Sequence, residues 1–132
     1  MATSKFISKW SGADLTDAGA YVSKDFNTFQ NAFKREIVRI CENIGATLSW
    51  FSKGHYDVSG CIERNGHFVH FSYDNSCNAG GRTHVNLRCR GPFFCRTAAH
   101  AKDYRGGYNV FIPFTEAQEN FDRLLNQEHR AF

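Results

Sequence analysis

Histidine and aspartate residues lie close together in the middle of the chain, where their side chains could perform acid–base chemistry. His55 and Asp57 precede an Asn65–Gly66 turn, His70 follows it, and His100 lies further along the chain. An imidazole that is oriented by a carboxylate can transfer protons near neutral pH. If the protein is an enzyme, we expect these His and Asp residues to serve a small nuclease or hydrolase. The alternative, which we favour, is that they belong to the solvated outer face of a half-buried sheet.

A second group of side chains could bind an anion or a nucleic acid. Residues 96–107 combine cations, a histidine and an aromatic ring with two adjacent glycines, Gly106 and Gly107. The pattern matches neither a P-loop nor a dinucleotide-binding fingerprint, whose glycines have a fixed spacing between a strand and a helix. A structured turn, in which the glycines supply positive φ, is the alternative interpretation. The predicted binding residues are Arg88, Arg90, Arg96, His100, Lys102, Tyr104 and Arg105.

The cysteines give little support to a metal site. There are five, at positions 41, 61, 77, 89 and 95, and none belongs to a CxxC pair. Zinc sites usually take two ligands from one tight turn, which this spacing does not provide. An odd and irregular set is also a poor disulfide framework. We therefore predict reduced thiols in a cytoplasm, with no metal and no cofactor.

The composition is that of a folded chain with a slight basic excess. Of its 132 residues, 42% are apolar and 15% are aromatic, which suits one packed domain of this length. The net charge of +3 permits a polyanionic partner and excludes a strongly acidic mimic of DNA. No apolar run approaches the roughly 20 residues that a membrane span needs. The first eleven residues also lack the apolar core of a secretory signal, so we expect no membrane partner.

The apolar pattern predicts the elements that would position these residues. Residues 1–24 show no sustained period and are expected to form an arm with room for a short strand. From 25 to 44 apolar residues recur at spacings of three and four, which predicts an amphipathic helix. Alternation after Gly45 then predicts strands over 46–51, 55–64 and 67–73.

The Asn65–Gly66 turn predicts the register of the central hairpin. A two-residue type I′ turn needs positive φ at both positions, and this pair of residues favours it. Once the turn is fixed, Val58 lies opposite Tyr73 and Asp57 lies opposite Asp74. The second pair is unusual, because like charges directly opposite each other destabilise a hairpin.

The second half of the chain supplies the rest of the sheet and a closing helix. Alternation over 84–90 predicts a strand beside the hairpin, and a short strand is expected at 93–96. The polar face of the first of these strands carries His84, Asn86, Arg88 and Arg90. The spacing of Thr115 and Gln118 predicts a capping box at the start of the last helix. We predict a single α+β domain over 1–132, in which an antiparallel meander sheet of 4–5 strands packs against an N-terminal and a C-terminal helix.

Two stretches of the chain carry a family resemblance that covers roughly residues 46 to 125. The first stretch comprises Trp50–Gly60, Ile62–Gly66, Val69, Phe71 and Ser72. The second comprises Arg96–Ala98, His100, Lys102–Tyr104, Gly106, Gly107, Asn109, Asn120, Phe121 and Arg123–Leu125. In these motifs the chain resembles small uncharacterised accessory proteins that are carried by conjugative elements and other mobile DNA of gut and Gram-positive bacteria.

Accessory proteins of this origin include anti-restriction and anti-CRISPR factors, so the resemblance implies an inhibitor of host defence in a bacterial cytoplasm. The leading hypothesis is an anti-CRISPR-like inhibitor that binds a Cas effector or its guide RNA complex and blocks it without catalysis. The alternative is an accessory protein of a mobile element that binds nucleic acid directly. The small nuclease or hydrolase is the third hypothesis.

Overall fold

The computed structural model describes residues 4–16, 24–54, 57–74 and 82–130. In chain order the elements are α1 (Lys5–Trp10), β1 (Asp14–Thr16), α2 (Lys24–Ile44), β2 (Thr47–Lys53), β3 (Asp57–Arg64), β4 (His67–Asp74), β5 (Arg82–His84), β6 (Phe93–Ala98), β7 (Val110–Phe111), a 3₁₀ turn (Phe114–Glu116) and α3 (Ala117–Leu125).

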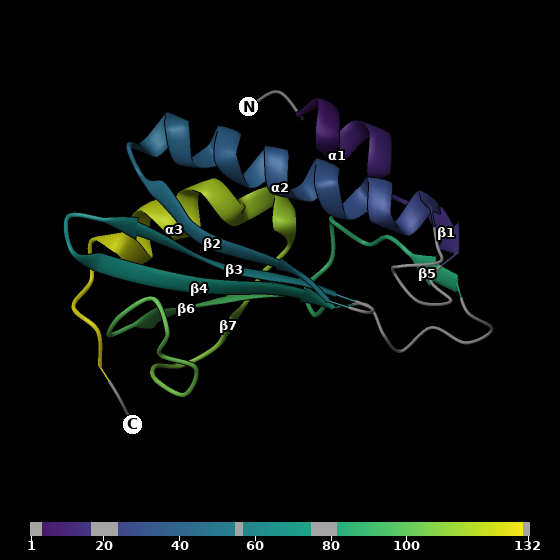
Figure 1. Ribbon diagram of the computed structural model, residues 1–132. Coiled ribbons are helices and arrows are strands. Elements are labelled where there is room, and N and C mark those ends of the chain that lie inside the picture. The colour runs from purple at the N-terminus through teal and green to yellow at the C-terminus, as the bar shows by residue number, and fades with distance from the viewer. Residues whose placement is uncertain (1–3, 17–23, 55–56, 75–81, 131–132) are drawn as a thin grey trace.

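The fold has two layers, as the sequence predicts. A five-stranded antiparallel sheet in the order β2-β3-β4-β6-β7 forms one layer, and β1 and β5 form a separate two-stranded sheet. The helices α1, α2 and α3 lie on one side of the five-stranded sheet (Figure 1). We call this side the inner face and the opposite side the outer face. The predicted α+β class and meander sheet are confirmed.

Aromatic side chains of α2 form the centre of the core. Phe29 and Phe33 are fully buried, and the ring centroid of Phe33 lies 4.8 Å from Phe114 and 5.7 Å from Tyr73. Rings at such distances stabilise a core beyond the area that they bury. The helix ends where predicted, since Gly45 has a φ of +70° and follows its last residue.

The predicted register of the central hairpin is confirmed. Asn65 and Gly66 have φ values of +53° and +80°, as a type I′ turn requires. Asp57 of β3 lies opposite Asp74 of β4. Burial, and then the charge of Asp74, raise the pKa of the Asp57 carboxyl above its usual value.

The N-terminal arm contains a helix that the sequence does not predict. The Ser4 hydroxyl accepts a hydrogen bond of 3.1 Å from the Ile7 amide and caps α1. This helix has only six residues, too few for a period to be visible. The expected short strand is present as β1, which pairs with β5.

The predicted strand over 84–90 is wrong for most of its length. Regular pairing ends at His84 in β5, and β4 is bordered by β6 instead. The backbone after His84 forms hydrogen bonds with other segments of the chain. The Val85 amide donates to the Ala13 carbonyl (2.8 Å), and the Thr115 amide donates to the Leu87 carbonyl (3.2 Å). Consequently the basic side chains of this segment do not extend the outer face of the hairpin.

The last helix starts differently from the prediction. Thr115 lies within a 3₁₀ turn, and Glu116 precedes α3 without a capping bond from its side chain, so the predicted capping box does not form. Arg64 fixes the C-terminal end of this helix to the hairpin. Its guanidinium donates to Asp122 Oδ1 (2.7 Å), to the Asp122 carbonyl (3.0 Å) and to Asn126 Oδ1 (3.0 Å).

Candidate functional site

A row of four side chains crosses the outer face of the sheet. Trp50, Cys61, His70 and Arg96 are direct neighbours in β2, β3, β4 and β6. The connection between β6 and β7, residues 99–109, passes over this side of the sheet (Figure 1). As a result Cys61, His70 and Arg96 are only 0%, 6% and 7% exposed. Part of the polar sheet face that the sequence predicts to be solvated is therefore buried.

Arg96 holds this connection in place. Its Nη2 donates to the Asp103 carbonyl at 2.6 Å and to His70 Nδ1 at 3.3 Å. Its Nη1 donates to the carbonyls of Thr97 and Gly106. Burial lowers the pKa of this guanidinium, although the charge of Asp103 opposes that effect. Arg96 is a predicted binding residue, but its donors are used within the protein, so its role here is to position the connection.

His70 completes the buried row. Its Nε2 lies 3.0 Å from the Ala101 carbonyl, which also accepts a hydrogen bond of 2.7 Å from Trp50 Nε1. A carbonyl only accepts and a guanidinium only donates, so this arrangement suits a neutral imidazole protonated at Nε2. Burial and then the charge of Arg96 lower the pKa of His70.

Asp103 organises the connection from within. Its carboxylate accepts hydrogen bonds from the backbone amides of Ala99 (2.9 Å), Gly106 (2.9 Å) and Arg105 (3.3 Å). The bond from Ala99 is the main cause that lowers the pKa of Asp103. Asp103 is the one acidic residue between residues 99 and 109, and its carboxylate points into the connection. The exposed charges of the connection are therefore positive.

Of the two adjacent glycines, Gly107 has the positive φ that the structured-turn interpretation expects. Gly107 has a φ of +77°, and a β-carbon there would collide with the Thr97 carbonyl oxygen of β6. A β-carbon on Gly106 would collide with the Asp103 carboxylate. A side chain at Gly107 would therefore require the backbone to move, whereas one at Gly106 would require the Asp103 and His129 side chains to move.

An exposed aromatic ring lies on the outside of this assembly. The Tyr104 ring centroid lies 5.9 Å from His70 and 6.2 Å from Trp50, yet the residue is 66% exposed. Lys102 and Arg105 flank it and are exposed. We call these three residues the Tyr104 surface.

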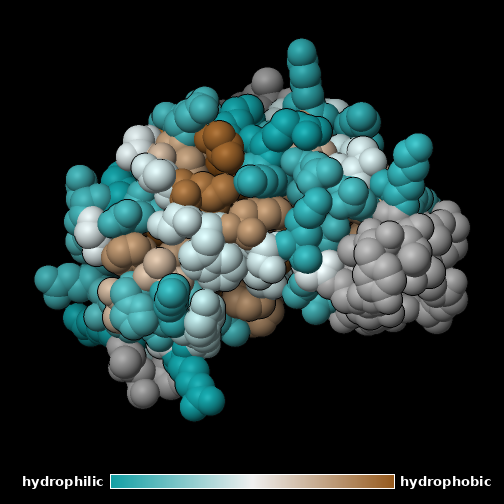
Figure 2. Space-filling model, viewed as in Figure 1, coloured by the Kyte–Doolittle hydropathy of each residue, from teal (hydrophilic) through white to brown (hydrophobic). Residues whose placement is uncertain are grey.

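Further aromatic residues continue from this surface along the same segment. The large hydrophobic residues exposed in the described part of the chain are Val38, Tyr104, Tyr108 and Phe111, so three of the four lie between 104 and 111. The side of the molecule seen in Figure 2 is mostly hydrophilic, and its darkest brown atoms lie in the upper part of the view. The predicted binding residues do not include Tyr108 and Phe111, although two aromatic residues so soon after Gly107 were a usable signal.

The described residues among those proposed for catalysis do not meet. His55 lies outside the described residues, and Asp57 and His70 belong to different cross-strand pairs. Asp57 is four positions along β3 from the partner of His70, roughly 13 Å at about 3.3 Å per residue. His100 is exposed, and its Nδ1 accepts a hydrogen bond of 3.2 Å from the Lys102 amide. No Asp–His pair is formed by these groups within the described chain.

The predicted binding residues fall into two separate regions. Lys102, Tyr104 and Arg105 share one surface, and His100 lies beside them in the same connection. Arg88 and Arg90 are exposed in the segment after β5, and Arg88 lines a hollow beside α1 and α2. The predicted set is thus not one continuous site.

Three of the four cysteines in the described part of the chain are buried. There, no three His, Cys, Asp or Glu side chains are grouped so that they could hold a metal ion. Burial raises the pKa of Cys41 to about 11 and of both Cys61 and Cys95 to about 12, so these thiols are poor ligands and nucleophiles at neutral pH. Cys89 is exposed, and Cys77 lies outside the described residues.

Comparison with protein-family models, with curated protein sequences and with solved structures finds no match to this chain. None of the described helices has the length and apolar character that a membrane crossing demands.

Proposed function

We propose that this protein binds single-stranded nucleic acid, most favourably RNA, through the Tyr104 surface. The observation that carries the proposal is the exposed Tyr104 ring, which rests against His70 and Trp50 and is flanked by Lys102 and Arg105. A base can stack on the free side of such a ring, while cations beside it neutralise the phosphates of the strand.

Two features of the site favour this partner. The ring contacts His70 and Trp50, so part of its freedom is already lost before a base stacks on it. Lys102 and Arg105 form no salt bridge with the described residues, because Asp103 is hydrogen-bonded to the backbone beneath them. Their charges are therefore available to a polyanion.

The test is a binding measurement with a labelled single-stranded RNA of about 12 nucleotides that has hydroxyl groups at both ends. Tyr104→Ala should weaken binding by about 5- to 150-fold, since a stacked base contributes about 1–3 kcal/mol, and Tyr104→Phe should retain it. Lys102→Gln should reduce the slope of log affinity against log salt by about 0.7, the value for one phosphate of a single strand.

A matched control is available on the other side of the molecule. Lys34 and Arg35 are exposed on α2, which covers the inner face. Lys34→Gln with Arg35→Gln removes the same charge as Lys102→Gln with Arg105→Gln, and should leave most of the affinity intact. Equal losses in the two double variants would mean that net charge alone drives binding and would refute the proposed surface.

The inhibitor of a Cas effector or its guide RNA complex is the second candidate function. One observation favours it as well: exposed tyrosine beside arginine is the composition of energetically dominant residues at protein interfaces. It predicts that the protein suppresses cleavage by an effector complex, and that Tyr104→Ala relieves the suppression. Unchanged cleavage at large molar excess would reject this function for the effector tested.

A further inference from the structure

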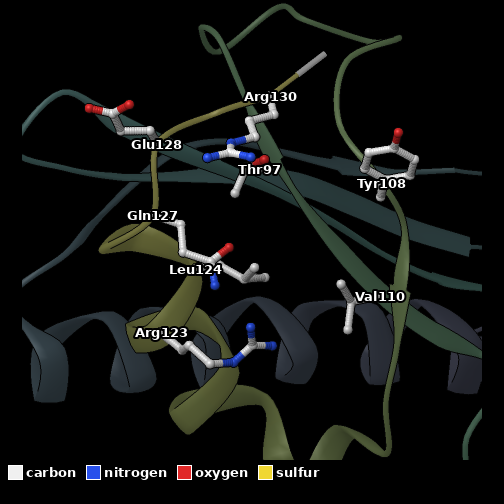
Figure 3. A pocket seen from close by; sticks show the side chains of 8 residues that line it. All are labelled: Thr97, Tyr108, Val110, Arg123, Leu124, Gln127, Glu128 and Arg130. Carbon is white, nitrogen blue, oxygen red and sulfur yellow. The ribbon is translucent and has the colours of Figure 1, made fainter. Parts of the chain in front are cut away.

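We propose that the groove between β7, α3 and the C-terminal segment is a separate site for a phosphorylated nucleoside. The groove has a volume of about 610 Å³, within the range of about 300–1,000 Å³ that small-molecule sites occupy. Its lining comprises Thr97, Tyr108, Val110, Arg123, Leu124, Gln127, Glu128 and Arg130. Figure 3 shows these side chains around the open space.

Two guanidinium groups give the groove its charge. Arg123 is carried by α3 and Arg130 by the segment that follows it, and both residues are exposed. Arg123 donates one hydrogen bond of 2.8 Å to Asn120 Oδ1, whereas Arg130 makes no hydrogen bond or ion pair with the described residues. The acid in the lining, Glu128, points away from the open space (Figure 3). The two guanidinium groups lie toward opposite ends of the open space (Figure 3), so one can bind the phosphate oxygens while the other adds positive charge.

The remaining lining is suited to a flat ring. Val110 points into the space from β7, Leu124 faces it from α3, and the Tyr108 ring lies at its rim (Figure 3). Tyr108 is 65% exposed, so one side of its ring is accessible to a base. A bare phosphate would leave this apolar wall in contact with water, and an aliphatic phosphate would leave the ring unused. A nucleotide uses both parts of the groove.

The segment that carries Arg130 is held against the sheet. His129 Nδ1 lies 3.2 Å from Thr97 Oγ1, and His129 Nε2 lies 3.5 Å from the Asp103 carboxylate. Two residues earlier, the Gln127 carbonyl lies 2.8 Å from His67 Nδ1. These contacts fix the backbone on both sides of Glu128, so Arg130 begins from a defined position beside the groove.

The probes are AMP, UMP and inorganic phosphate, titrated into the full chain by calorimetry. We expect both nucleotides to bind more tightly than phosphate alone. Arg123→Gln and Arg130→Gln should each weaken nucleotide binding by about 10- to 100-fold, since each removes a charge-assisted contact. Arg35→Gln, on the exposed side of α2, should have no effect. Absence of binding at millimolar nucleotide, or equal losses in all three variants, would overturn the site.

A free nucleotide and the end of a strand share this chemistry, and a second comparison separates them. If the source is a strand end, RNA with a 5′- or 3′-phosphate should bind more tightly than the same RNA with hydroxyl ends, and Arg130→Gln should abolish the difference. If the source is a free nucleotide, AMP binds while end phosphorylation changes nothing. Only the strand-end outcome rests on the proposed function. Hydroxyl-ended RNA that binds while AMP does not would refute this groove and leave the Tyr104 surface standing.

Discussion

The Nη2 of Arg96 lies 3.3 Å from Nδ1 of His70, so a permanent cation faces a histidine ring beneath the exposed Tyr104. Because the guanidinium only donates, His70 must present an unprotonated Nδ1, and its remaining proton is on Nε2 towards the Ala101 carbonyl. The connection between β6 and β7 therefore packs against a histidine that has to be neutral. This couples the order of the Tyr104 surface to pH.

The first prediction concerns that coupling. The pKa of His70 is lowered in the fold from its ordinary value of 6.5, so the unfolded chain binds more protons just below that pH. The contribution of His70 to stability is thus complete above pH 6.5 and is lost as the pH falls through the lowered pKa. Urea unfolding between pH 7.5 and 5 should show this loss, and His70→Asn should reduce it.

The control for this pH dependence is His70→Gln, which also removes the titrating imidazole and should reduce the slope as His70→Asn does. If both variants keep the slope of the intact protein, the titrating group lies elsewhere and the coupling is refuted.

A second prediction tests Arg96 as a positioning residue. Arg96→Lys cannot satisfy the carbonyls of Thr97, Asp103 and Gly106 together. An unsatisfied buried group costs about 1–3 kcal/mol, so we expect a loss of about 2–4 kcal/mol of the free energy of unfolding. Trypsin should also cut after Lys102 and Arg105 much faster than in the intact protein, as mass spectrometry of the fragments would show. Arg90→Lys, at an exposed position, should change neither measurement.

The parts of this structure that follow from local rules were predictable from the sequence. The Asn65–Gly66 turn gave the register of the hairpin, and the spacing of phenylalanines in α2 gave the main helix. The covering of the outer face was not predictable. The alternation of His70 with core residues shows which side of the sheet it occupies, but its burial depends on Ala101, which is 31 residues away. Likewise, the sequence predicted that His84 belongs to the main sheet, because an alternating pattern does not specify which strand pairs with it. In the structure His84 pairs with Asp14 of β1.

A third prediction uses the like charges at the end of the hairpin. Asp57 lies opposite Asp74, and the pKa of Asp57 is raised by burial and by that neighbour. A raised carboxyl pKa means that the fold loses stability as the pH rises through it, so ionised Asp57 destabilises the protein at neutral pH. Asp57→Asn should therefore increase the free energy of unfolding by up to about 1 kcal/mol at pH 7. Asp74→Asn removes the same repulsion, so the double variant should gain less than the sum of the two single gains. Additive gains would show that the two carboxylates do not interact.

The fourth prediction separates backbone strain from close approach at the turn beneath the Tyr104 surface. Gly12 and Gly107 have similar φ values of +80° and +77°, but a β-carbon at Gly12 meets no atom within 4 Å, whereas one at Gly107 collides with the Thr97 carbonyl. Gly12→Ala should cost about 1–2 kcal/mol, the ordinary cost of a left-handed conformation for a side chain. Gly107→Ala should cost more than this, because the segment must also move away from β6, and it should weaken RNA binding by the Tyr104 surface. Chemical denaturation and RNA titration of both variants provide the comparison. Equal costs, with RNA binding intact in both variants, would show that the close passage over Thr97 is not what holds the Tyr104 surface in place.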